Sequence, residues 1–578
     1  MRNGKKFTMG FLPTLLVLVA MLMVACGGGG GTSNVTPTAA PAKAPASQQV
    51  FRDPLPVSDI ATFDPGQATD LYSAQSIYMV FTGLVQLDDQ LQVKPQLASS
   101  WTTSSDNLTW TFTLKPGLKF SDGTPLTSAD VVYSIDRALS PQIASLNGVS
   151  LTYLGLINDS DKRVNGKIST LIGDSLVTPD ANTVVIKLNK PGAYFLDALT
   201  YQTSWVVEKK VIDQFGTKWT DHLADNGGQG GAGPWVVTSW DHTKGITFAP
   251  SPNYYGAKPQ LSQVQFLFYK SSKTAYEAYQ ANQLDATPIP SANFDQAKTM
   301  PGFSKTPSLA IFYFAMNYLT KPFDNINIRQ AFELALNKDV LLQAVFKGRG
   351  VPTCHIVPNG MPGYNSSLTC PAGAPTSGDN AKAQSLFNQG LQEEGLTAST
   401  LPAITLTYPN GNPDTDNYVT SARQMWKTVL GVDVKAQAID FNQLLTDIVN
   451  STNNAKGLQL WWIGWIADYP DPQDWTTLQF AKGSPNNNMN YGQNSTSSAT
   501  LQQQAQQQLA QADVTGNQTQ RLQMYNTAEQ QLVNDVAWLS LWQDEITRLV
   551  RPYVTGIKFN SEDLRPSDDW ASIYIATH

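Results

Sequence analysis

The order of predicted elements between residues 401 and 440 limits the possible folds of this chain more than any other feature. Strand-like segments at 401–409 and 432–440 flank a helix-like segment at 417–431, and the whole has the length of one strand–helix–strand unit. Such a unit places its two strands parallel in one sheet, and parallel sheets are covered by helices. The sequence therefore predicts an α/β fold.

Other segments carry the same two periodicities without a fixed repeat. Residues 108–115, LTWTFTLK, alternate apolar and polar side chains, which predicts a half-buried strand. Residues 128–139 place apolar side chains on one helical face, with Ser128 as the candidate N-cap. A helical pattern runs from 499 to 534, before the apolar segment at 537–542. At 578 residues, the chain should hold about three domains or lobes.

Charge and composition exclude several classes of protein. Lys and Arg number 39 against 46 Asp and Glu, so the chain is acidic. Nucleic acid is not an expected partner, because binding phosphates requires clustered cations. Only three Cys and four His occur, which argues against a Cys-rich scaffold or a multi-histidine metal centre. We expect no metal and no cofactor.

The amino terminus reads as an export signal. Basic residues precede the apolar run 11–25, which is shorter than the roughly 20 residues of a membrane span and meets Cys26. Met23 to Cys26 resembles a bacterial lipobox, which predicts a signal peptide at 1–25 and acylation of Cys26. An ordinary signal peptide is the alternative. Residues 26–49 are rich in Gly, Ser and Pro, which predicts a flexible tether to the outer face of the cell membrane.

The other two cysteines, Cys354 and Cys370, lie 16 positions apart. Thiols oxidise outside the cytoplasm, so we predict a disulfide, which would stabilise the fold by about 3 kcal/mol. The alternative is a metal site that adds His355, but it lacks a fourth obvious ligand.

Several motifs occur in a family-specific order. Residues 95–101 read PQLASSW, residues 117–123 read GLKFSDG and residues 129–132 read ADVV; GGAGPWVVTSW at 230–240, PNYYG at 252–256 and GWIADYPDPQDW at 464–475 follow. This order resembles the extracytoplasmic solute-binding proteins of family 5, the peptide-binding and dipeptide-binding components of ABC importers. The resemblance covers nearly all of the chain from Val50 onward.

The resemblance implies a two-lobed clamshell of the type II periplasmic-binding-protein class, with an additional domain. By analogy, one lobe comprises 50–87, 205–305 and 545–578, the additional domain 88–204, and the other lobe 306–544. Hinges are expected near 306 and 545. The resemblance also implies a monomer that delivers its ligand to an ABC permease and its ATPase subunits.

The ligand contacts implied by the resemblance lie in one short segment. The carboxylate of Asp468 would bind the ammonium terminus of a peptide, Gly464 and Ile466 would offer main-chain groups, and Trp465 would wall the neighbouring pocket. Without the resemblance, Asp468 would be read as a turn residue before Tyr469. Residues that grip the ligand carboxylate are not assigned.

Other functions remain open alternatives. The segment WWIGW makes an oligosaccharide ligand plausible, although Trp461, Trp462 and Trp465 cannot all face one side of a strand, so at least one belongs to the core. A nickel or haem role is weaker, because His222, His242, His355 and His578 are scattered.

An enzyme is the alternative from another class. A secreted glycosidase could use Asp468 and Asp471 as an acid and base pair. No further catalytic motif accompanies them, so we expect a binding protein without catalytic residues.

Overall fold

The computed structural model describes residues 41–147 and 150–578, and residues 43–578 form one compact unit. The predicted signal peptide, Cys26 and most of the predicted tether lie outside the described residues. Near the C-terminal end, the Ile575 carbonyl accepts hydrogen bonds from the Ala44 N–H at 2.9 Å and from the Gln49 amide at 2.8 Å. The last residues of the stretch predicted as a tether, 44–49, are thus held against the C-terminal end of the chain, where the Gln49 side chain is buried.

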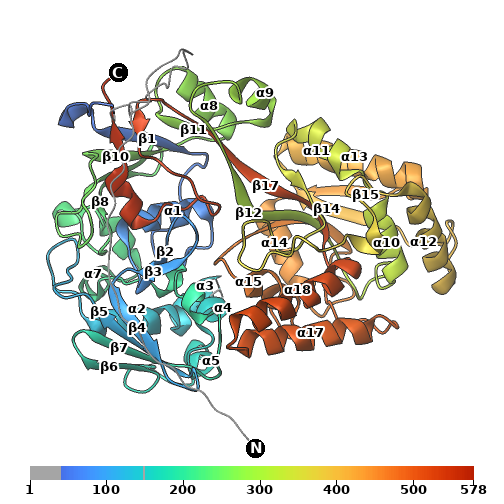
Figure 1. The fold of residues 1–578 in the computed structure, drawn as a ribbon, viewed down its shortest axis with the longest axis horizontal. Coiled ribbons are helices and arrows are strands. Elements are labelled where there is room, and N and C mark those ends of the chain that lie inside the picture. Colours follow the sequence, from blue (N-terminus) through green and yellow to red (C-terminus); the bar gives the residue numbers. More distant parts are fainter. Residues whose placement is uncertain (1–40, 148–149) are drawn as a thin grey trace, which may run out of the picture. The chain divides into compact units, whose positions relative to one another are not determined.

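The first sheet has four strands in the order β1-β10-β9-β8 (Figure 1). Strand β1 runs parallel to β10, and the other neighbours are antiparallel. Phe51, Trp235 and Phe248 are fully buried in its core. Its strands are β1 (Val50–Leu55), β8 (Trp235–Asp241), β9 (Gly245–Pro250) and β10 (Gln263–Phe268), and the helices in the same stretches of chain are α1 (Leu71–Val80), α7 (Lys209–Phe215), α8 (Ser272–Gln280) and α9 (Phe294–Ala297).

The second sheet is antiparallel throughout, in the order β4-β5-β7-β6. The strand predicted at 108–115 is β5 and the helix predicted at 128–139 is α2, so both predictions are confirmed. The N-cap is Thr127 and not Ser128, because the Thr127 N–H donates to the Asp130 carboxylate at 2.8 Å in a capping box. This part contains β4 (Ala98–Thr103), β5 (Thr109–Leu114), β6 (Leu176–Asp180), β7 (Thr183–Lys187), α2 (Ser128–Ala138), α3 (Pro141–Asn147), α4 (Ser150–Leu154), α5 (Ser160–Val164) and α6 (Phe195–Ala198).

A short hairpin of β2 (Val85–Leu87) and β3 (Val93–Pro95) precedes the second sheet along the chain. A second small pair, β18 (Val554–Thr555) and β19 (Tyr574–Ile575), follows the last long strand. The C-terminal segment that contains this pair packs into the core of the first sheet, where Trp570 and Ile575 are buried.

The third sheet is mixed, in the order β11-β17-β12-β16-β14-β15, and β13 also pairs with β17. Strand β14 is parallel to both β15 and β16, and β12 is antiparallel to both β16 and β17. The strand–helix–strand unit predicted at 401–440 is β14, α13 and β15, and the α/β class is confirmed. The strands are β11 (Ala286–Pro288), β12 (Phe303–Met316), β13 (Val351–Pro352), β14 (Thr405–Pro409), β15 (Lys435–Ile439), β16 (Leu460–Ile466) and β17 (Leu539–Val550).

Helices cover the two faces of the third sheet. Trp426 of α13 packs on one face, in the cluster that contains Trp462, and Leu444 of α14 packs on the other face, in the cluster that contains Trp461. The helices are α10 (Ile326–Leu334), α11 (Lys338–Phe346), α12 (Asn380–Glu393), α13 (Pro413–Leu430), α14 (Phe441–Asn450), α15 (Pro472–Trp475), α16 (Thr477–Phe480), α17 (Ala499–Val514) and α18 (Gln518–Asn534).

The helical pattern predicted at 499–534 is confirmed, and two helices, α17 and α18, occupy this stretch. The break falls at Thr515–Asn517, where Gly516 is a weak helix former and the Asn517 side chain accepts the Gln520 N–H at 3.0 Å. Both helices bury apolar side chains at helical spacing. The apolar pattern alone therefore does not reveal the break between them.

Two long strands of the third sheet, β12 and β17, run side by side and extend toward the part of the chain that holds the first sheet (Figure 1). Thr306 pairs with Ile546, and the register shifts between Pro307 and Ile311. The two positions predicted as hinges, near 306 and 545, are thus neighbours in adjacent strands.

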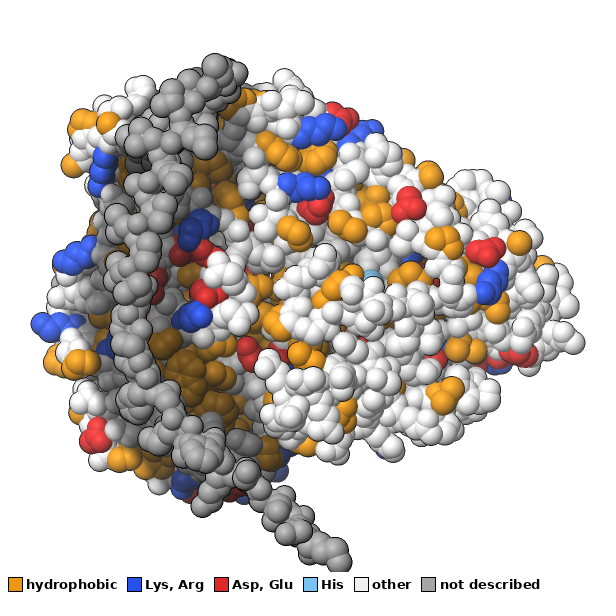
Figure 2. Space-filling view, viewed as in Figure 1, with side chains coloured by type: hydrophobic (Ala, Val, Ile, Leu, Met, Phe, Trp, Pro, Cys, Tyr) orange, Lys and Arg blue, Asp and Glu red, His pale blue; other side chains and the backbone are white. Residues whose placement is uncertain are grey.

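Cys354 and Cys370 form a disulfide with a Cα–Cα distance of 5.5 Å. Neither sulfur is therefore available as a thiolate for the alternative metal site at His355. Within residues 41–147 and 150–578, no helix combines the length and apolar character needed to cross a bilayer. On the described part of the face seen in Figure 2, Lys and Arg side chains are scattered, and they form no large basic patch there.

Candidate ligand-binding site

One edge of strand β16 has no partner over most of its length. Strand β12 pairs with β16 from Met316 opposite Leu460 to Ala310 opposite Ile466. On the other edge, β14 pairs only with Leu460 and Trp461. Among the described residues, no strand pairs with this edge from 462 to 466, which we call the open edge. Free N–H and C=O groups along such an edge can bind an added strand.

The main chain of Gly464 and Ile466 points toward the open edge. The Ala467 N–H donates to the Leu309 carbonyl of the neighbouring strand at 2.9 Å. In an antiparallel ladder, successive residues point their main-chain groups to opposite edges. Residues 464 and 466 therefore point away from β12, as the resemblance implies for a peptide contact.

Gly464 also allows a close approach of an aromatic ring. A Cβ at this position would lie 2.7 Å from a ring carbon of Phe312. The Phe312 ring is held between Trp462 and Trp542, with centroid distances of 5.2 and 4.8 Å. A larger residue at 464 would therefore displace a packed ring next to the open edge.

The three tryptophans of β16 have different environments. Trp461 is buried on one face, and Trp462 is buried on the other, where it stacks on Phe312. Trp465 is half-buried, and its Nε1–H donates to the Asp474 carboxylate at 3.2 Å. Of these three rings, Trp465 is therefore the one that keeps partial exposure, and its bond to Asp474 orients it.

Asp468 follows the open edge directly. Its N–H donates to the Asp474 carboxylate at 3.2 Å, which holds the turn after β16. Its side chain is half-buried, yet the atom Oδ2 is fully buried and has no hydrogen-bond partner among the described residues. Burial raises the pKa of Asp468 to about 7, although hydrogen bonding from the Tyr153 hydroxyl opposes this rise.

The surroundings of Asp468 come from distant parts of the chain. Tyr153 of α4 stacks on Tyr201 with centroids 3.8 Å apart. Burial raises the pKa of both hydroxyls, and the charge of Asp468 raises it further. Tyr469 lies in the core of the second sheet, with its ring 6.3 Å from that of Tyr153. The segment after β16 therefore joins the third-sheet part to the second-sheet part.

Two more carboxyl groups lie in the same acidic environment. Burial raises the pKa of Glu562 to about 8, and the charges of Asp468 and Asp197 add to this rise. Burial also raises the pKa of Asp197 to about 8, with a further contribution from Asp471. Within the described part of the chain, no basic side chain counts among the groups that shift the pKa of Asp468. A cation placed beside Asp468 would therefore favour the ionised form of this carboxyl group.

Asp471 differs from Asp468, because both of its carboxylate oxygens have partners. It forms an ion pair with Arg521, and its other oxygen accepts the Gln473 N–H at 2.9 Å, which caps α15. Both oxygens of Asp471, the second carboxylate of the acid and base pair considered for a glycosidase, are thus engaged in contacts within the protein.

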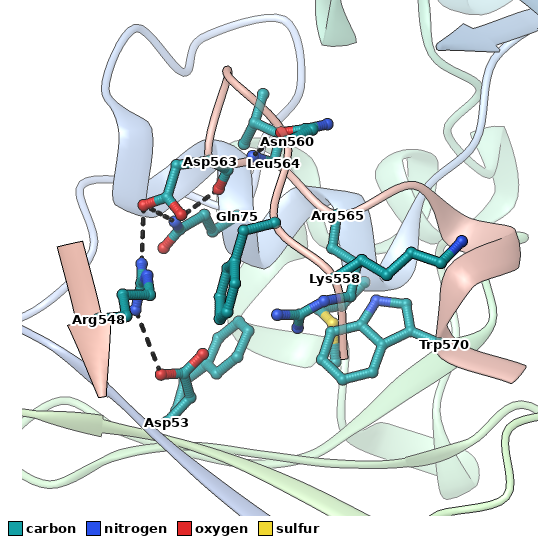
Figure 3. A pocket seen from close by; sticks show the side chains of 12 residues that line it. Asp53, Gln75, Arg548, Lys558, Asn560, Asp563, Leu564, Arg565 and Trp570 are labelled. Carbon is teal, nitrogen blue, oxygen red and sulfur yellow. Dashed lines mark hydrogen bonds and ion pairs between the residues drawn. The ribbon is translucent and has the colours of Figure 1, made fainter. Parts of the chain in front are cut away.

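A solvent-open hollow of about 730 Å³ lies on the sheet face beside the site and is lined by Ile466, Phe312, Arg349 and Glu562. Arg548 lines this hollow and also a smaller one (Figure 3). There it lies 3.5 Å from Asp53 of β1 and 2.7 Å from Asp563. These two ion pairs fasten the end of β17 to strand β1 of the first sheet and to the C-terminal segment.

Sequence reasoning named the segment from Gly464 to Asp468 but missed its partners. Tyr153, Tyr201 and Glu562 lie outside any motif of residues 464–475. Asp474 lies in the motif and reads as part of a polar turn. Its role in holding both Trp465 and Asp468 depends on burial, which no local pattern reveals.

Comparison with known proteins gives consistent matches. The family model "Bacterial extracellular solute-binding proteins, family 5 Middle" matches residues 92–487. The oligopeptide-binding protein OppA of Bacillus subtilis (strain 168) is 26% identical over 483 residues, which are 82% of this chain and 84% of that protein. The probable deoxycholate-binding periplasmic protein YgiS of Escherichia coli (strain K12) is 28% identical over 546 residues, 93% of this chain and 96% of that protein.

A solved structure gives the same result for the fold. The Escherichia coli murein tripeptide binding protein MppA matches with a TM-score of 0.73 and 25% identity, over 92% of this chain and 99% of that chain. This match confirms the predicted two-lobed α/β clamshell of type II.

Proposed function

Because this chain belongs to the bacterial extracellular solute-binding proteins of family 5, we propose that it binds an oligopeptide between its two lobes and presents it to an ABC importer. Members of this family are solute-binding proteins and not enzymes. The homologues of this chain include peptide-binding proteins of ABC importers.

The open edge of β16 together with the free carboxylate oxygen of Asp468 carries the proposal. A protein that accepts many peptides must bind what peptides share, which is the main chain and the charged termini. Gly464 and Ile466 offer main-chain groups to an added strand. Two residues farther along, Asp468 offers an unpartnered, buried oxygen to an ammonium group. A buried charge without a partner costs several kcal/mol, so the two opposite charges favour each other.

The environment of the tryptophans supports a peptide over an oligosaccharide. Sugar binding would use exposed aromatic faces, but Trp461 and Trp462 are buried in the cores of opposite sheet faces. Trp465 alone among the three keeps partial exposure. A single ring can wall a peptide pocket but offers little stacking surface for several sugars.

We assign the lobes to stretches of chain as the resemblance implies. One lobe would comprise 50–87, 205–305 and 545–578, the additional domain 88–204, and the other lobe 306–544. The first and second sheets lie within the first two of these parts. Strands β12 and β17 cross the proposed hinges, near 306 and 545, as paired neighbours. Closure about these hinges would exclude water from the peptide and strengthen its contacts.

A lipid anchor at Cys26 would complete the function. The family is extracytoplasmic, and an acylated Cys26 would keep the binding protein near its permease and ATPase partners. The test is the mass of the N-terminal peptide from membrane-extracted protein. A diacylglyceryl adduct on Cys26 supports the anchor, and an unmodified or differently cleaved terminus contradicts it.

Native mass spectrometry of the purified protein, followed by titration calorimetry, tests the ligand class. The probes are tri-, tetra- and penta-alanine, maltotetraose, and deoxycholate, since one relative is named for it. The expected result is co-purified peptide and binding of at least one alanine peptide. Masses spaced by hexose units, or binding of maltotetraose or deoxycholate without any peptide, would refute the peptide proposal.

A further inference from the structure

Helix α14 presents a row of exposed apolar side chains. Phe441, Leu445 and Val449 are 49%, 41% and 64% exposed, and they are spaced by four residues along one helix face. We call these three residues the α14 stripe. Ile466, at the end of β16, is 46% exposed. Single exposed apolar residues are ordinary, but a row of them on one face indicates a contact surface.

The α14 stripe accounts for much of the exposed apolar surface. Of the ten large apolar side chains that are strongly exposed in the described part of the chain, three form the α14 stripe. Ile466 is a fourth, but side chains alternate along β16, so it lies on the sheet face of Trp462, opposite to the face that α14 covers. The others are scattered over different elements, so the concentration on α14 needs its own explanation.

The topology places the α14 stripe beside the open edge. Strands β14, β15 and β16 are parallel, so their carboxyl ends lie at one side of the sheet. Helix α14 begins two residues after β15 ends, which puts Phe441 at the same side as Ile466. The inner face of α14, with Leu444 and Ile448, lies in the cluster on which Ile463 and Trp465 pack. The helix therefore covers the sheet face that adjoins the open edge.

The dimensions of the two features agree. From Phe441 to Val449 the helix rises about 12 Å, at 1.5 Å per residue. From residue 462 to 466 the strand extends about 13 Å, at roughly 3.3 Å per residue. A peptide paired with the open edge would send alternate side chains to the face that α14 covers. An extended tetrapeptide spans the whole stripe.

We infer that the α14 stripe contacts the ligand side chains on this face and makes the site selective for apolar residues at alternate positions. This inference rests on the proposed function. The helix carries no Lys or Arg, and its acidic residue Asp447 accepts a hydrogen bond from Gln443 at 2.8 Å. Acidic ligand side chains would find no counter-charge on α14, whereas leucine would bury apolar surface on both partners.

Calorimetry with four tetrapeptides tests the inference. The probes are tetra-alanine, Leu-Ala-Leu-Ala, Ala-Leu-Ala-Leu and Ala-Glu-Ala-Glu. One of the two leucine peptides should bind at least about tenfold more tightly than tetra-alanine, and the glutamate peptide should bind more weakly. The leucine peptide that gains affinity identifies the positions that face the stripe.

Variants connect this preference to the helix. Leu445→Gln combined with Val449→Gln should abolish the advantage of the leucine peptide and leave tetra-alanine affinity within about twofold. Both side chains are exposed, so the fold should persist, and thermal unfolding checks this. Leu501→Gln on α17 is the matched control, because Leu501 is 51% exposed on a different helix.

The outcomes separate this inference from the proposed function. If no peptide binds the unmodified protein, the proposed function fails. If tetra-alanine binds but leucine gives no gain, or if the gain survives in the double variant, the α14 inference alone is refuted. A double variant that changes only the sedimentation behaviour of the protein would make the stripe a contact between copies of this chain, and would also refute it.

Discussion

Replacing Asp468 by asparagine keeps the shape of the side chain but removes the charge that we assign to the peptide ammonium group. Truncating one partner of a buried, hydrogen-bonded charge pair typically costs about 2 to 5 kcal/mol of binding free energy. Because the pKa of Asp468 is raised to about 7 in the ligand-free protein, this cost should depend on pH. At pH 8 the carboxylate is mostly ionised, and the full cost of the substitution should appear.

At pH 5.5 the unmodified protein must lose a proton before it binds an ammonium group. With a pKa of about 7, the cost of that proton is about 2 kcal/mol, at 1.36 kcal/mol per pH unit. The affinity of the unmodified protein should thus fall about thirtyfold between pH 8 and pH 5.5, whereas that of Asp468→Asn should change less. Asp197 and Glu562 also titrate in this range, so the difference between the two proteins isolates Asp468.

Calorimetry with tetra-alanine and N-acetyl tetra-alanine completes the test as a double-mutant cycle. Acetylation removes the ligand charge, so it should weaken binding to the unmodified protein but have little further effect on Asp468→Asn. Asp433→Asn, at an exposed carboxylate, is the control variant. Unchanged tetra-alanine affinity at pH 8, or equal losses for the free and the acetylated peptide, would remove Asp468 from the ammonium site.

Three further predictions concern stability and packing. Gly464→Ala should destabilise the protein by about 1 to 3 kcal/mol in urea unfolding and weaken peptide binding, because the added Cβ would lie 2.7 Å from the Phe312 ring. Gly516→Ala is the control and should bind peptide normally, because its Cβ would lie 3.7 Å from the nearest atom. The double variant Cys354→Ser with Cys370→Ser should lower the free energy of unfolding by about 3 kcal/mol, because the disulfide joins residues 16 positions apart. Its peptide affinity should not change. An unchanged melting temperature would contradict this prediction. The pKa of Glu562 is raised to about 8, above its unfolded value, so the stability of the ligand-free protein should be highest near pH 5 and fall toward pH 8. Glu562→Gln should make this fall smaller. A stability of the unmodified protein that rises from pH 5 to pH 8 would refute the prediction.

Local patterns predicted the elements whose periodicity is unambiguous. The alternation at 108–115 and the strand, helix and strand order at 401–440 correspond to β5 and to β14, α13 and β15. The helical pattern at 499–534 corresponds to α17 and α18, but it does not reveal the break between them, where Asn517 starts a new helix through a capping bond. A cap of this kind is decided by a single side chain, and summed propensities do not resolve it.

The site was predictable only where its residues are contiguous. Gly464, Trp465, Ile466 and Asp468 belong to one motif, so the resemblance reaches them together. Tyr153, Tyr201 and Glu562 meet Asp468 through tertiary packing, and no short-range signal marks them. The absence of a partner for the Asp468 Oδ2 atom among the described residues likewise depends on tertiary packing, which no local pattern reveals.

The proposed function also explains why acidic groups from three parts of the chain meet at one point. Asp468 follows β16, Asp197 lies in α6 beside the second sheet, and Glu562 belongs to the segment that packs on the first sheet. Burial is the main cause of their raised pKa values, and the charges of Asp468 and Asp197 raise the pKa of Glu562 further. An ammonium group placed among these buried groups would favour their ionised forms. We therefore expect a peptide with a free ammonium terminus to favour a closed arrangement more than a neutral solute of the same size does.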